Sequence, residues 1–222
     1  PRAGEVARAS ILTNYEDVPF EKAFGTIVAE RIADLIVMLG IIGITLFLQF
    51  DFIYGFLIEK FDPIKIIIVL SAGVIMILLF LRFIRKSKSK IALKIRTFVG
   101  GLIEGALSIF KMKNKWAFIF HTIFIWAMYV LMFWATIPAI DGLQVPSGGI
   151  LVGFIAGGFS IAATNGGIGL YPLAVAGAFT LFGVPEEPST AFGSVMWAAQ
   201  TAMVILFGGL SFLLLPICNK AK

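Results

Sequence analysis

The sequence predicts an all-α, polytopic integral membrane protein, and its composition and the length of its apolar runs are the observations that predict it. Of the 222 residues, 59% are hydrophobic and 14% are charged, and the mean hydropathy is +0.97. A soluble domain carries about 25% charged residues, so most of this surface must face lipid. Unbroken apolar runs of about twenty residues predict spanning helices, whereas a β-barrel needs shorter alternating segments. The same proportions exclude a disordered chain and a nucleic-acid partner.

Four spanning helices are predicted within one membrane domain that covers residues 1–222. A helix rises about 1.5 Å per residue, so about twenty apolar residues cross about 30 Å of hydrocarbon. The spans are expected at about 30–50, 64–84, 116–140 and 190–216. Residues 1–20 precede them as a short helix and turn. Because the chain begins with Pro1 and not Met, we expect it to be a fragment of a longer chain that lacks its upstream helices.

The basic residues are concentrated in one connector. Ten of the eighteen Lys and Arg residues lie between Arg82 and Lys115. The positive-inside rule therefore places the loop 85–115 and the C-terminus in the cytoplasm, with the protein in the plasma (inner) membrane. Residues 91–110 repeat apolar residues at helical spacing, which predicts an amphipathic helix on the cytoplasmic membrane surface. Contacts with anionic phospholipids are expected from Arg85, Lys86, Lys88, Lys90, Lys94 and Arg96.

A glycine-rich stretch at about 148–183 predicts a broken or re-entrant helix pair. It contains ten glycines, and its apolar pieces 150–163 and 173–182 are each too short for a comfortable crossing. Irregular backbone at membrane depth is tolerated only where protein buries it or a wet cavity faces it. The break between the two pieces is therefore the best candidate for a cavity.

Within this break, Asn165, Gly166, Gly167 and Gly169 are candidate substrate-path residues. Glycine frees the backbone for positive φ, and Pro172 suits the first turn of a helix whose N-terminus offers free N–H groups to an anion. The alternative is that the glycines only allow close helix packing, as small residues do in membranes. Packing is the preferred interpretation for Gly193 and for the pair Gly208-Gly209 in the last span.

A second group of candidates is charged and lies near the start of the first span. It comprises Arg2, Gly4, Glu5 and Arg8, followed by Glu30, Arg31 and Asp34. The spacing of Glu5 and Arg8, and of Arg31 and Asp34, makes ion pairs available along a helix. Charges inside a span usually face a cavity or one another. They are interpreted either as structural interface pairs or as part of a path for a lipid headgroup.

Catalytic, metal and cofactor sites have little support in the sequence. Cys218 is the single cysteine and His121 the single histidine, so neither a disulfide framework nor a Cys/His metal cluster is available. The sequence has no P-loop and no GxSxG motif. We therefore expect no catalytic residue, no metal and no cofactor in this chain.

Three motifs resemble the flippase-like membrane domain family of lysylphosphatidylglycerol synthases, over most of the chain. They are Pro1-Arg-Ala-Gly-Glu-Val-Ala-Arg8, Ala29-Glu-Arg-Ile-Ala-Asp34 and Asn165-Gly-Gly-Ile-Gly169. The resemblance implies a polytopic helical domain whose best-understood members move an aminoacylated phospholipid between leaflets. Relatives without a synthase domain are linked to lipid-linked glycan assembly. The positions that match the recurrent motifs are Gly4, Glu5, Arg8, Glu30, Arg31, Asp34, Gly166, Gly167 and Gly169.

The chain departs from the family pattern at the break. Where relatives have Pro-Gly-Gly followed by Glu, this sequence has Asn165 and Pro172, so a carboxylate is missing from that half of the site. The soluble aminoacyl-transfer domain is absent from this chain, and lysyl transfer is not expected from it.

The leading hypothesis is a translocase that moves a phospholipid or a lipid-linked headgroup between leaflets. The alternative is a non-catalytic membrane scaffold for lipid or cell-envelope glycan assembly, with a lipid-modifying enzyme or a glycosyltransferase as partner. A membrane-embedded transferase is a third option, for which the sequence offers no nucleophile–base pair.

Overall fold

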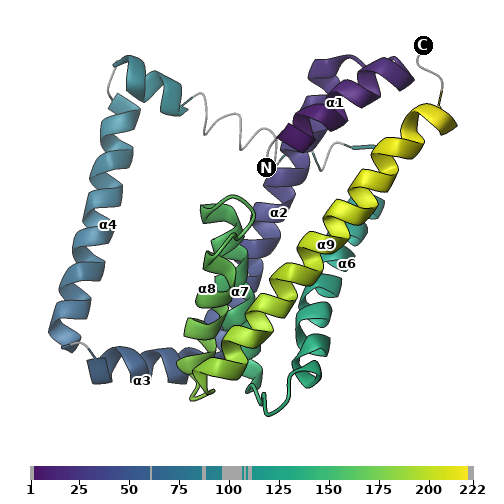
Figure 1. The fold of residues 1–222 in the computed structure, drawn as a ribbon. Coiled ribbons are helices and arrows are strands. Elements are labelled where there is room, and N and C mark those ends of the chain that lie inside the picture. Colours follow the sequence, from purple (N-terminus) through teal and green to yellow (C-terminus); the bar gives the residue numbers. More distant parts are fainter. Residues whose placement is uncertain are drawn as a thin grey trace. The chain divides into compact units, whose positions relative to one another are not determined.

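The computed structural model describes residues 3–60, 62–86, 89–96, 107, 109 and 112–219. The prediction of an all-α protein is confirmed, because the described residues form helices and contain no strand (Figure 1). In chain order the helices are α1 (Ala3–Glu16), α2 (Phe20–Leu48), α3 (Phe50–Lys60), α4 (Pro63–Lys86), α6 (Lys115–Thr136), the 3-10 helix η1 (Ile137–Ala139), α7 (Ser147–Ala163), α8 (Leu170–Thr180) and α9 (Glu186–Cys218).

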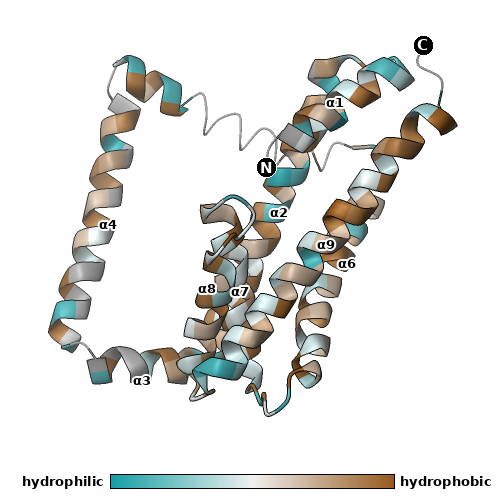
Figure 2. Cartoon of the chain, in the orientation of Figure 1, coloured by the Kyte–Doolittle hydropathy of each residue, from teal (hydrophilic) through white to brown (hydrophobic). Residues whose placement is uncertain are grey.

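Three stretches among the described residues are long and apolar enough to cross a membrane. They are Lys22–Leu48 in α2, Lys115–Ala139 through α6 and η1, and Glu186–Ile217 in α9. Figure 2 shows hydrophobic residues along most of the length of α6 and α9. A shorter apolar stretch, Ser71–Ile84, lies within α4. Helix α2 begins well before the apolar run at residue 30, because its first turns pack against α1.

The chain divides into two compact units, residues Pro1–Thr45 with Trp116–Lys222, and residues Leu46–Lys115. The second unit contains α3, α4 and a helical segment at 90–96. Within it, Arg96 donates from Nε to the carbonyl oxygen of Ile84 at 2.6 Å, and Nη2 donates to the same oxygen. A guanidinium group at this position satisfies a carbonyl near the C-terminal end of α4 and complements the helix dipole.

Helices α7 and α8 form an antiparallel hairpin in the first unit. Gly149, Gly153 and Gly157 recur every four residues and therefore lie on one face of α7. Aromatic rings of the returning chain cover this face, with Phe182 at Gly149, Phe179 at Gly153 and Tyr171 at Gly157. A Cβ atom at Gly153 would lie 2.4 Å from Cε1 of Phe179, so only glycine permits this approach.

Both helices of the hairpin are shorter than a helix that spans a membrane. The 17 residues of α7 extend about 25 Å and the 11 residues of α8 about 16 Å at 1.5 Å per residue. A bilayer core is about 30 Å thick, so α8 cannot cross it. The pair is therefore a broken helix, in which residues 164–169 separate two short apolar arms.

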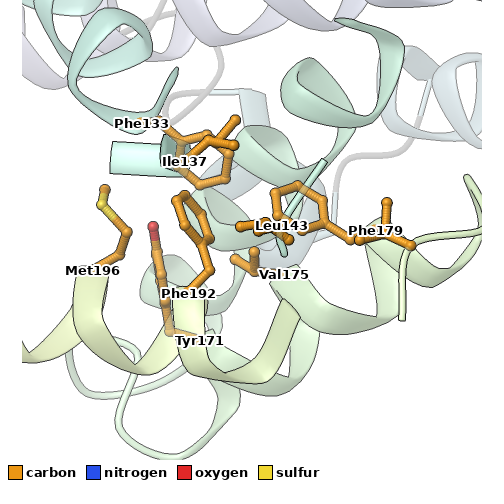
Figure 3. Packing of buried hydrophobic residues seen from close by; sticks show 9 residues of the cluster. Phe133, Ile137, Leu143, Tyr171, Val175, Phe179, Phe192 and Met196 are labelled. Carbon is orange, nitrogen blue, oxygen red and sulfur yellow. The ribbon is translucent and has the colours of Figure 1, made fainter. Parts of the chain in front are cut away.

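The main core of the first unit forms where α6, α8 and α9 meet. Its buried residues are Phe133, Ile137, Leu143, Tyr171, Val175, Phe179, Val184, Phe192 and Met196. Figure 3 shows the rings of Phe133 from α6 and Phe192 from α9 close together, and their centroids are 4.9 Å apart in an edge-to-face arrangement. Gly193 of α9 approaches the backbone of Pro172, where a Cβ would lie 2.7 Å from the proline Cα. The packing role expected for Gly193 is confirmed, whereas Gly208 and Gly209 meet no atom within 4 Å in the described part of the chain.

We predict that Gly153→Ala destabilises the protein and that Gly177→Ala on the same hairpin does not. The added methyl at position 153 would collide with the Phe179 ring, which is fully buried and cannot move aside. Overpacking of this kind costs about 1–3 kcal/mol. At Gly177 a methyl meets no atom within 4 Å. The free energy of unfolding, measured by circular dichroism during SDS titration of the detergent-solubilised protein, checks the prediction, and equal stability of the two variants would contradict it.

Candidate charged cluster and glycine break

Helix α1 folds back on the first turns of α2. The connection is Asp17–Pro19, in which Asp17 takes a left-handed φ of 55°, a conformation that Asp tolerates better than most residues. The backbone N–H groups of Lys22 and Ala23 both donate to the Pro19 carbonyl at 3.0 Å and start α2. A small apolar contact of Ala9, Ala23 and Ile27 holds the two helices together. The turn therefore brings the charged residues of α1 beside those of α2.

Two crossed ion pairs join α1 to α2. Arg8 donates to both carboxylate oxygens of Glu30, with Nη1–Oε2 2.9 Å and Nη2–Oε1 2.6 Å. In the opposite sense, Nε of Arg31 lies 3.1 Å from Oε1 of Glu5. Each helix thus supplies one acid and one base to its neighbour. Glu5 and Arg8 are spaced for an ion pair within α1, but each of them has its partner on α2.

Asp34 extends this network to α6. Its Oδ2 atom lies 3.4 Å from Nη1 of Arg31, which is the ion pair expected from the spacing of the two residues. Its Oδ1 atom accepts a hydrogen bond from the indole Nε1 of Trp126 at 3.0 Å. We call Glu5, Arg8, Glu30, Arg31 and Asp34 the charged cluster. Its two guanidinium groups face three carboxylates, which leaves a net charge of −1.

The ion pairs of the charged cluster are accessible from outside the protein. The exposed fractions are 52% for the Arg8 side chain, 61% for Arg31 and 33% for both Glu5 and Glu30. Pairs this exposed contribute only about 0.2–1 kcal/mol each where water screens them. The hydrogen bond to Glu30 raises the pKa of Arg8 above its usual value against the opposing effect of burial. The guanidinium group therefore stays charged throughout the physiological pH range, and it remains available to any anion that displaces Glu30.

The second candidate region, residues 164–169, is called the glycine break. Gly166, Gly167 and Gly169 have φ values of 75°, 80° and 72°, which explains why glycine occupies these positions. The N–H of Gly167 donates to Thr164 Oγ1 at 3.0 Å, and its carbonyl accepts from the Tyr171 N–H at 2.9 Å. The carbonyl of Gly166 accepts from Nε1 of Trp197 on α9 at 2.9 Å. The break is thus an ordered turn fixed to α9, with Asn165 exposed.

The structure brings some of the sequence candidates together and leaves others apart. All five members of the charged cluster are joined by ion pairs, whereas Gly4 is exposed with no atom near its Cα hydrogens. Arg2 lies outside the described residues. The glycine break is a separate region, and α7 connects the two: a Cβ at Gly158 would lie 2.6 Å from Cε of Met38, one turn beyond Asp34.

The basic residues expected at the membrane surface are described only in part. Lys90 and Lys94 are exposed on the helical segment 90–96, and Arg96 caps α4 as described above. Lys88, the side chains of Arg85 and Lys86, and most of the expected helix 91–110 lie outside the described residues. Within the part of the chain that the structure describes, no group of three or more His, Cys, Asp and Glu is placed to hold a metal ion.

Trp126 and Trp197 are functional candidates that the sequence reasoning missed. Tryptophan in membrane proteins favours the interfaces, where its N–H meets water. Both of these residues instead lie well inside long apolar helices, so each indole N–H needs an acceptor from the protein. The position of both tryptophans in the middle of apolar runs can be read from the sequence, but it does not identify Asp34 or Gly166 as the acceptor.

These features define a polytopic α-helical membrane protein with a short helical hairpin and a charged cluster at one end of its first span. The family model described as "Lysylphosphatidylglycerol synthase TM region" matches residues 1–208. The chain belongs to this family, as its motifs suggested, and the family ties it to a membrane-lipid function. No curated protein and no solved structure matches the chain.

We predict that Glu30→Arg loosens α1 from α2, because it places a third cation beside Arg8 and Arg31. Amide hydrogen exchange of residues 3–16, followed by mass spectrometry in detergent, should accelerate about twofold to fivefold, the equivalent of a lost exposed ion pair. The double variant Arg8→Glu, Glu30→Arg restores opposite charges and should recover part of the protection. Glu16→Arg makes the same change at an exposed position of α1 and is the control. Equal acceleration in the control would contradict the prediction.

Proposed function

We propose that this chain is a lipid translocase, in which the charged cluster binds the polar headgroup of a phospholipid or lipid-linked substrate as it moves between leaflets. The observation that carries the proposal is a set of five charged side chains at the end of a lipid-crossing helix, paired but half-exposed. Charges in spans are costly and usually mark a substrate path or pair with one another. We assign both roles to this cluster, because its charges are paired and the pairs are accessible enough for a headgroup to replace one partner.

Partner exchange would let a headgroup enter without leaving charges unpaired. A lipid phosphodiester can take the place of Glu30 on Arg8, because a guanidinium group binds phosphate and carboxylate in the same bidentate manner. The released carboxylate then needs a cation. A headgroup that carries an amine as well as a phosphate supplies this cation, whereas a purely anionic headgroup does not. The net charge of −1 favours the first kind of substrate.

The rest of the path follows from the same unit. Acyl chains would stay in lipid along the exposed apolar faces of the spans, and the glycine break would offer the headgroup an exposed polar turn at membrane depth. No residue pattern for energy coupling accompanies the cluster in the sequence, so movement would run down the gradient of the lipid or be coupled to an ion through Glu30 and Asp34.

The proposed setting is the plasma membrane with the basic segment in the cytoplasm. Lys90 and Lys94 would hold this segment to anionic phospholipids. The proposed role is transport without catalysis. A scaffold for a lipid-modifying enzyme or glycosyltransferase is the competing role that the following experiment separates from it.

We predict that the double variant Glu30→Gln, Asp34→Asn loses leaflet exchange at least tenfold while it folds normally. Neutralising both carboxylates removes the partner of Arg8 and one partner of Arg31, so the headgroup can no longer exchange with them. The measurement is exchange of fluorescent phosphatidylglycerol, its aminoacyl form and an isoprenoid-linked sugar in proteoliposomes, with the aminoacyl form expected to move faster than phosphatidylglycerol.

The matched control is Asp51→Asn, Glu59→Gln, which removes two exposed carboxylates from α3. It should exchange lipid at the wild-type rate. Background exchange of all three lipids by folded wild-type protein would reject the translocase and favour the scaffold. Normal exchange by the Glu30→Gln, Asp34→Asn variant would instead place the headgroup path away from the charged cluster.

A further inference from the structure

We infer that Trp126 is a positioning residue that couples the charged cluster to the hairpin of α7 and α8. It occupies the place where α2, α6 and α7 meet. Its indole nitrogen donates to Asp34 on α2, and its ring lies edge to face against Phe154 on α7 with centroids 6.2 Å apart. One side chain on α6 therefore contacts both the charged cluster and the α7 arm of the hairpin.

On the side of the charged cluster, Trp126 fixes the direction of one carboxylate. The two oxygens of Asp34 have different partners, Oδ1 the Trp126 indole and Oδ2 the Arg31 guanidinium group. Arg31 is in turn shared with Glu5 of α1. Without the indole donor, Asp34 can turn both oxygens to Arg31 and compete with Glu5. Trp126 thereby determines how tightly Arg31 is held and how readily it accepts a new anion.

On the side of the hairpin, Trp126 is the first ring of a continuous aromatic chain. Phe154 contacts Phe133 at a centroid distance of 5.9 Å, and Phe133 contacts Phe179 of α8 at 6.0 Å. Phe133 and Phe179 are almost completely buried, so neither ring can turn without moving its neighbour. A displacement of Trp126 is therefore felt in α8, on the far arm of the hairpin.

A second tryptophan, Trp197 of α9, packs against the same buried core that contains Phe133 and Phe179. The indole N–H of Trp197 donates to the carbonyl of Gly166 in the glycine break. The two hydrogen-bonded indoles thus label the two regions separately. Trp116 and Trp134 are 74% and 57% exposed and face lipid or water, so they serve as internal references.

The test is nuclear magnetic resonance of the full chain with ¹⁵N-labelled indoles in detergent micelles. Asp34→Ala removes the acceptor and should shift the Trp126 resonance directly and the Trp197 resonance through the coupling. Trp126→Phe should shift the Trp197 resonance as well. Trp134→Phe makes the same substitution elsewhere on α6 and should leave it in place. A Trp197 resonance that is unmoved in both Asp34→Ala and Trp126→Phe would overturn the inference.

A transport readout tests the functional part, which rests on the proposed function. Trp126→Phe keeps an aromatic ring against Phe154 and loses only the donor to Asp34, so exchange of the aminoacyl lipid should fall about tenfold, the equivalent of one charge-assisted hydrogen bond. Trp134→Phe should exchange normally. In a cycle with Asp34→Asn, the two losses should not add, because both act through one contact. Additive losses would overturn the positioning role. Coupled resonances without exchange by the wild type would reject the translocase and leave the coupling standing.

Discussion

The hairpin of α7 and α8 interrupts its helical hydrogen bonding at residues 164–169, and much of the first unit is arranged to supply partners for the backbone polar groups of this turn. An unpaired peptide group in hydrocarbon costs several kcal/mol. In the glycine break, Thr164, the first turn of α8 and the indole of Trp197 on α9 supply hydrogen bonds to backbone groups of Gly166 and Gly167. These bonds require the arms of the hairpin and α9 to lie close together. The glycine face of α7, and Gly193 at Pro172, make that approach sterically possible.

The charged cluster, in contrast to the closely packed hairpin, has few apolar contacts and accessible ion pairs. Its apolar support is a contact of three small or medium side chains, and its ion pairs are half-exposed. Each pair contributes little to stability, yet two pairs crossed between the same helices specify one register of α1 on α2. A site of this kind keeps its components in place while any single pair is open. The proposed binding of a charged headgroup requires that property, whereas a hydrophobic core excludes it.

The sequence predicts the helical class and the hairpin well because both depend on local patterns. Apolar runs and glycine spacing are properties of neighbouring residues, and the Arg31–Asp34 pair follows from one turn of helix. The partners of Glu5 and Arg8 could not be predicted in the same way. Their spacing indicates a pair within α1, but the turn at Asp17 folds both onto α2, 22 residues away for Arg8 and Glu30.

The contact between Trp126 and Asp34 joins residues 92 positions apart, and only the packing of α6 beside α2 creates it. A sequence can show that an indole N–H inside a span needs an acceptor, but it cannot show which of several acceptors the packing supplies. The sequence likewise cannot show which glycines of the stretch 148–183 form a turn and which allow close helix packing, because both uses favour glycine. Positive φ values identify Gly166, Gly167 and Gly169 as turn residues, whereas Gly149, Gly153 and Gly157 serve packing.

Asp34 belongs to both the tightly packed and the loosely paired part of this unit. One of its oxygens is tied to an indole that packs into the aromatic core, and the other is tied to a guanidinium group that is largely exposed. A change of partner at Arg31 is therefore expected to change the position of Asp34 and of the indole that donates to it. We expect closely packed rings such as those of Phe133 and Phe179 to shift together in response. Because interactions at equilibrium are reciprocal, the coupling that we infer would also let a movement of the hairpin change how strongly Arg31 holds its carboxylate partners. Under the proposed function, this shared carboxylate alone would link the holding and release of a headgroup to the position of the hairpin.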